Sequence, residues 1–156
     1  MKQLLIRLAR AIIRAYEMPV LQKSDGMVVS ADQVLERLAD HFSDITIQLK
    51  DDQLADESYK LYTFREVRDI TNTWKPPWPY TKEFWDCDDD ARDMMNLVRA
   101  KLLGCAVFQV EGWVSATETH RWICYVGANG HVYEHNPRST FGGMIGLDWK
   151  PYWVGD

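Results

Sequence analysis

Apolar residues recur at helical spacing in three parts of the N-terminal half of the chain. Over residues 2–17, leucines and isoleucines recur at i, i+3 and i+4 spacing beside a face of arginines. Residues 31–43 follow a capping box made by Ser30 and Gln33, and residues 64–74 follow one made by Thr63 and Glu66. We expect helices in all three. The first is expected to pack on the core, with a membrane-surface or partner-binding helix as the alternative.

Short extended and irregular segments are predicted between these helices. Asp25-Gly26 between apolar runs indicates a hairpin or a tight turn, and alternation over residues 45–49 indicates a short strand. The acidic residues 50–58 are expected to form a loop. Residues 75–80, Lys-Pro-Pro-Trp-Pro-Tyr, end regular structure. We expect a stiff connector there, and the alternative is a ligand for a proline-recognising module.

The C-terminal half combines one long helical pattern with several strand patterns. Residues 87–103 have helical apolar spacing, and Gly104 suits the position after a helix. Strands are predicted over residues 105–114, 120–126 and 131–136, the last two joined by a turn at residues 127–130, with a possible last strand within 138–156. The pattern predicts one α+β domain of 156 residues, with an N-terminal helical part (1–44) and a core (45–156) whose helices pack against a small antiparallel sheet.

Composition narrows the classes of protein to which the chain can belong. A 46% hydrophobic and 26% charged chain is typical of a globular protein, and a net charge of −5 argues against a nucleic-acid partner. No stretch is long enough to span a bilayer, and arginines interrupt any signal-peptide core. Three cysteines without CxxC spacing suggest neither a zinc site nor a disulfide framework. We therefore expect a cytoplasmic protein without a membrane partner, and its oligomeric state stays open.

Cys87 is the candidate nucleophile because it begins the helical pattern of residues 87–103. Backbone N–H groups and the positive end of the helix dipole lower the pKa of a cysteine at such a position. Neighbouring aspartates act in the opposite direction, since they disfavour a second negative charge. They are Asp86, Asp88, Asp89 and Asp90. They can point to solvent, pair with Arg92 or Arg99, or bind a divalent cation. Acidic residues in the first turn of a helix also interact favourably with the helix dipole, which is an explanation without any metal.

His120 is the candidate general base, because it begins a strand whose hairpin partner carries two polar side chains that can orient an imidazole. If residue 126 opposes 131, Asn136 is a near neighbour of His120, and Glu134 shares a face with Asn136. Either side chain can accept a hydrogen bond from the imidazole and fix its tautomer. The other histidines, His41, His131 and His135, fit less well. Cys105 and Cys124 are expected to be buried thiols.

The segment Tyr-Thr-Lys-Glu-Phe-Trp-Asp-Cys-Asp-Asp-Asp-Ala at residues 80–91 resembles the Asp-Cys-Asp-Asp motif of papain-like and transglutaminase-like cysteine proteins of phages and bacteria. The calcium-dependent protease domain of a mushroom agglutinin is similar. The resemblance covers roughly residues 45–137 and implies a papain-like fold. It implies that Cys87 is the nucleophile, that a following histidine is the base, and that Asn136, before Pro137, orients the base. It also implies calcium at Asp88 and Asp89.

The chain departs from the family pattern at three places. Asn136 stands where the family has Glu, and Asp90 stands where it has Phe. No Gln lies between Gln53 and Cys87 to help build an oxyanion hole. The backbone N–H of Cys87 would serve instead, helped by Thr81, Trp78 or Trp85.

The sequence supports two main hypotheses about function. The first is a cysteine-dependent hydrolase (peptidase or amidase) or acyltransferase that acts on a protein or peptide, requires no cofactor, and uses Cys87, His120 and Asn136 or Glu134. The second is a catalytically inactive binding or structural protein on the same fold, with phage encoding and calcium binding as options. A calcium-sensing module is a third reading. The substrate is not predicted.

Overall fold

The computed structural model describes residues 27–42, 56–81, 86–138 and 149–155. Its elements are β1 (Met27–Ser30), α2 (Ala31–His41), β2 (Ser58–Leu61), α3 (Phe64–Thr71), α4 (Cys87–Lys101), β3 (Val107–Trp113), β4 (Thr119–Val126), β5 (Val132–His135) and β6 (Lys150–Gly155). The predicted helix at residues 2–17, the turn at Asp25-Gly26 and the strand at 45–49 lie outside the described residues.

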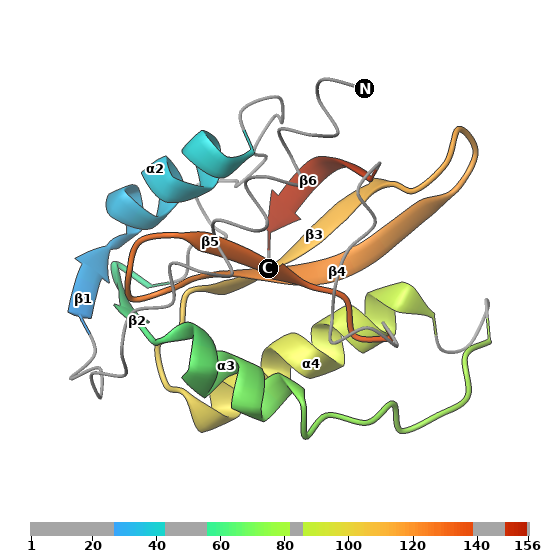
Figure 1. The fold of residues 1–156 in the computed structure, drawn as a ribbon, viewed down its shortest axis with the longest axis horizontal. Coiled ribbons are helices and arrows are strands. Elements are labelled where there is room, and N and C mark those ends of the chain that lie inside the picture. The colour runs from blue at the N-terminus through green and yellow to red at the C-terminus, as the bar shows by residue number, and fades with distance from the viewer. Residues whose placement is uncertain (1–26, 43–55, 82–85, 139–148, 156) are drawn as a thin grey trace.

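A four-stranded antiparallel sheet, in the order β5-β4-β3-β6, forms the centre of the fold. Figure 1 shows α2 on one face of this sheet and α3 and α4 on the other. Alternate residues of the central strands therefore enter two separate cores. The core on one face contains Leu38 of α2 with Phe108, Trp122 and Cys124. The core on the other face contains Ile123 and the buried residues of α4. Strands buried on both faces read as nearly continuous apolar runs, which explains the loose alternation of residues 105–114.

Both predicted capping boxes are confirmed. Gln33 N donates to Ser30 Oγ at 3.3 Å, and Glu66 N donates to Thr63 Oγ1 at 3.3 Å. The ends of all three described helices were predicted too far along the chain, since α2 ends at His41, α3 at Thr71 and α4 at Lys101. After α3 the backbone tightens into a turn, and the indole of Trp74 donates to Asp93 of α4 at 2.7 Å.

The structure adds a strand that the sequence did not predict. β2 begins at Ser58, inside the expected acidic loop, and pairs antiparallel with β1. Its alternation is short, with Tyr59 and Leu61 buried between more exposed neighbours, and a four-residue pattern is easily missed. Parallel bridges from Lys60 to Cys105 and from Tyr62 to Gly127 join this small sheet to the segments that flank β3 and β4.

The hairpin between β4 and β5 is confirmed, but its register differs from the prediction by one residue. Val126 pairs with Val132 and not with residue 131. The loop is longer than expected because Gly127 N donates to His131 O at 2.8 Å, and Gly130 adopts a φ of 76°. That left-handed conformation favours glycine. The shift moves His120 away from direct opposition to residue 137.

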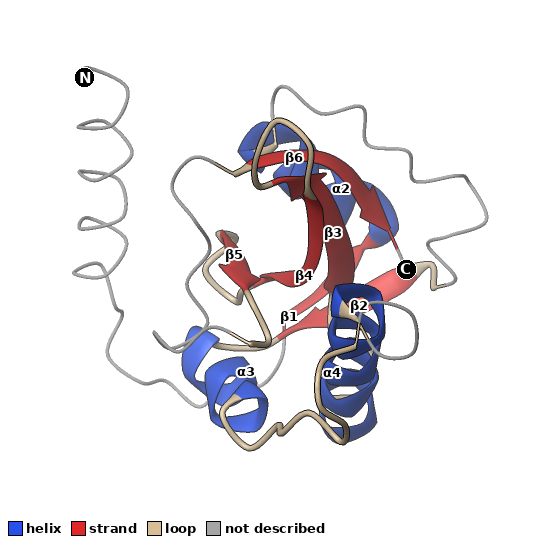
Figure 2. Ribbon diagram, turned by 90° about the vertical axis from the view of Figure 1, so that its right-hand side faces the viewer, coloured by secondary structure: helices blue, strands red, loops and turns tan. Residues whose placement is uncertain are grey.

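β6 is the predicted last strand, and it lies at one edge of the sheet beside β3 (Figure 2). Its pairing with β3 contains an irregularity between Glu111 and Gly112, and Pro151 lies opposite Gly112. A Cβ atom at Gly112 would lie 2.7 Å from the Pro151 Cα atom and 2.6 Å from the Trp122 ring. Glycine at this position therefore permits the close approach of β6.

None of the described helices has the length and apolar character that a membrane span requires.

Candidate active site

Cys87 is the first residue of α4, and the residue before it caps the helix. Asp86 Oδ1 accepts a hydrogen bond from Asp88 N at 3.0 Å, and Asp89 Oδ2 accepts one from Asp86 N at 3.3 Å. This is a capping box built from two aspartates. The predicted position of Cys87 at a helix N-terminus is confirmed.

The thiol of Cys87 is held in its protonated form. Burial raises the pKa of Cys87 to about 11; a hydrogen bond from the Arg121 backbone opposes that rise, and the charges of Asp88 and Asp86 add to it. The thiol also donates to Asp88 Oδ1 at 3.6 Å. Burial is therefore the main reason that the thiol is neutral in the resting protein, and the aspartates act in the same direction.

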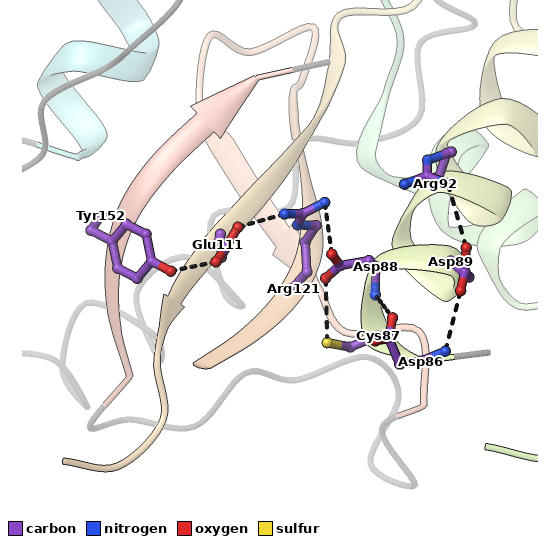
Figure 3. Close-up of polar contacts among 8 residues, drawn as sticks. All are labelled: Asp86, Cys87, Asp88, Asp89, Arg92, Glu111, Arg121 and Tyr152. Atoms are coloured by element: carbon purple, nitrogen blue, oxygen red, sulfur yellow. Dashed lines mark hydrogen bonds and ion pairs between the residues drawn. The ribbon is translucent and has the colours of Figure 1, made fainter. Parts of the chain in front are cut away.

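The other contacts of Asp88 lead away from the thiol to the edge of the sheet (Figure 3). Asp88 Oδ2 lies 3.2 Å from Arg121 Nη1, and the same guanidinium pairs with Glu111. Tyr152 of β6 donates to the other carboxylate oxygen of Glu111. Burial raises the pKa of Glu111, but the bonds from Tyr152 and Arg121 outweigh burial and leave that pKa lowered. A chain of polar contacts thus joins β6, β3 and β4 to the first turn of α4.

The carboxylates of Asp88 and Asp89 have different partners. Asp89 pairs with Arg92 at 3.4 Å, one of the two arginines considered from the sequence, whereas Asp88 pairs with Arg121. Among the described residues, the group with ligand atoms within 4.8 Å of one another is Asp86, Cys87 and Asp88. Calcium prefers several oxygen ligands, so two diverging, arginine-paired carboxylates do not fit one shared calcium ion well.

His120 and Asn136 are brought together by the start of β4 and the end of β5. His120 Nε2 lies 3.1 Å from Asn136 Oδ1. Since an amide oxygen only accepts, Nε2 is the donor of this bond, and in the neutral ring Nδ1 is the nitrogen with a free lone pair. Two tryptophan rings cover the imidazole: Trp149 at 5.0 Å between centroids and Trp122, nearly parallel, at 6.4 Å.

Glu134 has partners other than His120. Its carboxylate accepts from the Trp122 indole at 2.8 Å and lies 2.9 Å from His41 Nε2. The sequence therefore identified the right strand, but the contacts of Glu134 link α2 to the sheet. The role of His41 was missed because its helix lies far from Glu134 in sequence.

The structure places Cys87 beside β4 without a direct bond between its sulfur and His120. Among the described residues, the hydrogen bond of the thiol goes to Asp88, and the N–H that approaches the sulfur belongs to Arg121, the residue after His120. The remaining thiols, Cys105 and Cys124, are buried and form no disulfide, as expected.

Burial lowers the pKa of His135 to about 4, so that histidine is neutral near pH 7.

A buried ion pair between Asp90 and Arg138 was not foreseen from the sequence. Asp90 is 1% exposed, and both of its carboxylate oxygens accept from the Arg138 guanidinium. The signal in the sequence was the replacement of an expected phenylalanine by Asp90. A buried carboxylate needs a cation, and the sequence does not show which one.

Comparisons with known proteins identify relatives at the level of the fold. No protein-family model and no curated protein matches the sequence. A lectin from Polyporus squamosus, solved with a human-type influenza-binding epitope, matches 81% of this chain at 18% identity and a TM-score of 0.60. PSL1a in complex with E64 matches 81% at 18% identity and a TM-score of 0.57. The chain spans about half the length of these two structures, 49% and 50%. The likeness shows that the chain shares its mixed α+β fold with part of these two structures.

Proposed function

We propose that the protein is a cysteine-dependent hydrolase of the peptidase or amidase type, or an acyltransferase, with Cys87 as nucleophile, His120 as base and Asn136 as the residue that orients the base. The observation that supports it most directly is the 3.1 Å contact between His120 Nε2 and Asn136 Oδ1. In the neutral ring the free lone pair then belongs to Nδ1, and His120 lies on the strand whose Arg121 N–H approaches the sulfur of Cys87. A nucleophile, a base and an orienting group are the parts that thiol catalysis requires.

The reaction begins from a neutral thiol, since the pKa of Cys87 is raised to about 11. As the sulfur attacks an amide carbonyl carbon, the thiol proton moves to His120 Nδ1. The imidazolium gives this proton to the leaving amine as the C–N bond breaks, and a thioester remains. Water, or a second amine in the case of transfer, then attacks the thioester carbonyl while His120 takes its proton. The C–S bond breaks, the acyl group leaves as a carboxylic acid or a new amide, and the proton returns to the sulfur.

Backbone N–H groups are the available donors for the oxyanion of the tetrahedral intermediate. Cys87 N lies at the first position of α4, where helical N–H groups have no intrahelical acceptor. The side chain of Trp78, 63% exposed, is a further donor in the segment that precedes α4. A hole without a glutamine is expected to lower the rate, because one missing donor reduces kcat by roughly 100- to 1000-fold.

The test is covalent labelling by E64, an epoxide that a thiolate opens to form a thioether. One equivalent is expected on Cys87, located by mass spectrometry of peptides, and none on Cys105 or Cys124. Cys87→Ala should abolish labelling, and His120→Ala should slow it by roughly 100-fold or more, in line with general-base catalysis. Glu134→Gln is the matched control, since its partners are His41 and Trp122. Labelling no faster than that of free cysteine would refute the proposal.

The elevated pKa of Cys87 favours a second candidate, a catalytically inactive binding or structural protein on the same fold. Asp88 accepts a hydrogen bond from the thiol, and its negative charge disfavours the thiolate. In that case Cys87→Ala leaves ligand binding and folding unchanged, and E64 reacts slowly with the wild-type protein. The same labelling experiment therefore separates the two candidates.

A further inference from the structure

Asn136 lies beyond the part of β5 that the sheet holds in place. The pairing of β5 with β4 ends at His135, opposite Ile123. The backbone of Asn136 therefore lies outside the ladder that fixes the preceding residues. Its side chain nevertheless has to meet the ring of His120 at hydrogen-bond distance. Another anchor must determine where this residue lies.

The anchor is two residues further along the chain. Arg138 Nη2 donates to Asp90 Oδ1 at 3.0 Å, and Arg138 Nε donates to Asp90 Oδ2. Two parallel bonds between a guanidinium and a carboxylate fix both distance and orientation. Pro137 lies between Asn136 and Arg138, and its ring holds φ near −65°. A stiff link of one residue thus separates the anchored side chain from Asn136.

Asp90 connects this anchor to the candidate nucleophile. It lies in the first turn of α4, three residues after Cys87, and its side chain is buried. Arg138 also donates to the backbone oxygen of Trp78 at 3.2 Å and lies 5.3 Å above the ring of Tyr80. One guanidinium therefore holds together the segment before α4, the helix that begins with Cys87, and the segment that carries Asn136.

Stability alone does not explain this ion pair. Apolar residues of similar volume usually stabilise a core as well as a buried ion pair or better. What a forked pair adds is a defined geometry between two chain segments. We infer that Asp90 and Arg138 are positioning residues that set Asn136, and through it His120, relative to Cys87. The inference rests on the proposed function for its consequence in catalysis, and on contacts alone for its geometry.

The main test replaces both charges together. Asp90→Leu with Arg138→Met removes the fork without leaving a buried charge unpaired, so the thermal midpoint should stay within a few degrees of the wild type. The His120 Nε2–H signal, followed by ¹⁵N-resolved NMR, should be lost or shifted as its bond to Asn136 loosens. Labelling by E64 should slow at least tenfold. Asp93→Asn is the matched control: it changes an aspartate of the same helix that bonds Trp74, and neither the signal nor the rate should change.

The outcomes separate the inference from the proposed function. A folded double variant with an unchanged His120 signal overturns the positioning role. If the double variant does not fold, Arg138→Lys decides, because an ammonium keeps the charge but cannot form the fork. An unchanged His120 signal in that variant also overturns the role. If the wild type does not react with E64, the proposed function fails, while the NMR signal still tests the geometry.

Discussion

Asp88→Asn is expected to make Cys87 more reactive. In the wild type the carboxylate of Asp88 accepts a hydrogen bond from the thiol at 3.6 Å and contributes to the raised pKa of Cys87. The amide keeps the size of the side chain and removes its negative charge. The variant therefore tests directly whether the acidic surroundings of Cys87 keep it protonated.

The size of the effect follows from the distance. Two unit charges about 4 Å apart repel by about 1 kcal/mol in water and about 4 kcal/mol at an effective dielectric constant near 20. Arg121, 3.2 Å from Asp88, offsets part of this repulsion. A net loss of about 1–2 kcal/mol corresponds to a fall of about one pKa unit. The thiolate fraction at neutral pH then rises about tenfold, but a less basic thiolate attacks about threefold more slowly, so alkylation should speed up about threefold or more.

The assay is the second-order rate of iodoacetamide alkylation of Cys87 between pH 6 and 10, measured on the Cys87 peptide. This range lies below the raised pKa of Cys87, so the rate should be higher in Asp88→Asn at every pH because a larger fraction of the thiol is ionised. Asp89→Asn is the control, because that carboxylate bonds Asp86 N and Arg92. Equal rates in the wild type and Asp88→Asn, or an equal increase in Asp89→Asn, would refute the reasoning.

Three further predictions concern the core, a buried histidine and calcium. Leu38→Ala, at a fully buried position of α2, should lower the free energy of unfolding by about 2–5 kcal/mol in urea titrations; a loss under about 1 kcal/mol would contradict its burial. The pKa of His135 is lowered from 6.5 to about 4, so the unfolded chain binds more protons between these values and stability falls as pH drops through this window, by up to about 3 kcal/mol. His135→Phe should flatten this slope in denaturation from pH 7 to 4, and parallel slopes would exclude the explanation. Because Asp88 and Asp89 both pair with arginines, we expect millimolar calcium to leave the thermal midpoint unchanged. A raised midpoint would show that calcium binds and would contradict this expectation.

Local signals in the sequence located most of the described elements. Capping boxes and helical spacing act within a few residues, and the contacts of Ser30 and Thr63 follow them closely. The register of the last hairpin was wrong by one residue because the left-handed Gly130 lengthens the loop. A turn signal shows where a chain reverses, but the type of turn sets the register.

The candidate site was less completely predictable, since its contacts cross long distances in sequence. The contact between His120 and Asn136 was foreseen because both lie in one hairpin. The arginine that pairs with Asp90 is 48 residues away, and the histidine that contacts Glu134 is 93 residues away. Such pairs depend on how α2 and α4 pack on the sheet, which periodicity within one segment does not encode.

The two edges of the main sheet have a consequence for association between molecules. An exposed edge strand offers unpaired N–H and C=O groups to a strand from another chain. Here one edge, β5, has only four residues, and the other, β6, contains Pro151 and an irregular pairing with β3. Proline cannot donate a backbone hydrogen bond, and a bulge bends the strand. The described sheet therefore has built-in protection against adding strands from a second molecule and growing into aggregates.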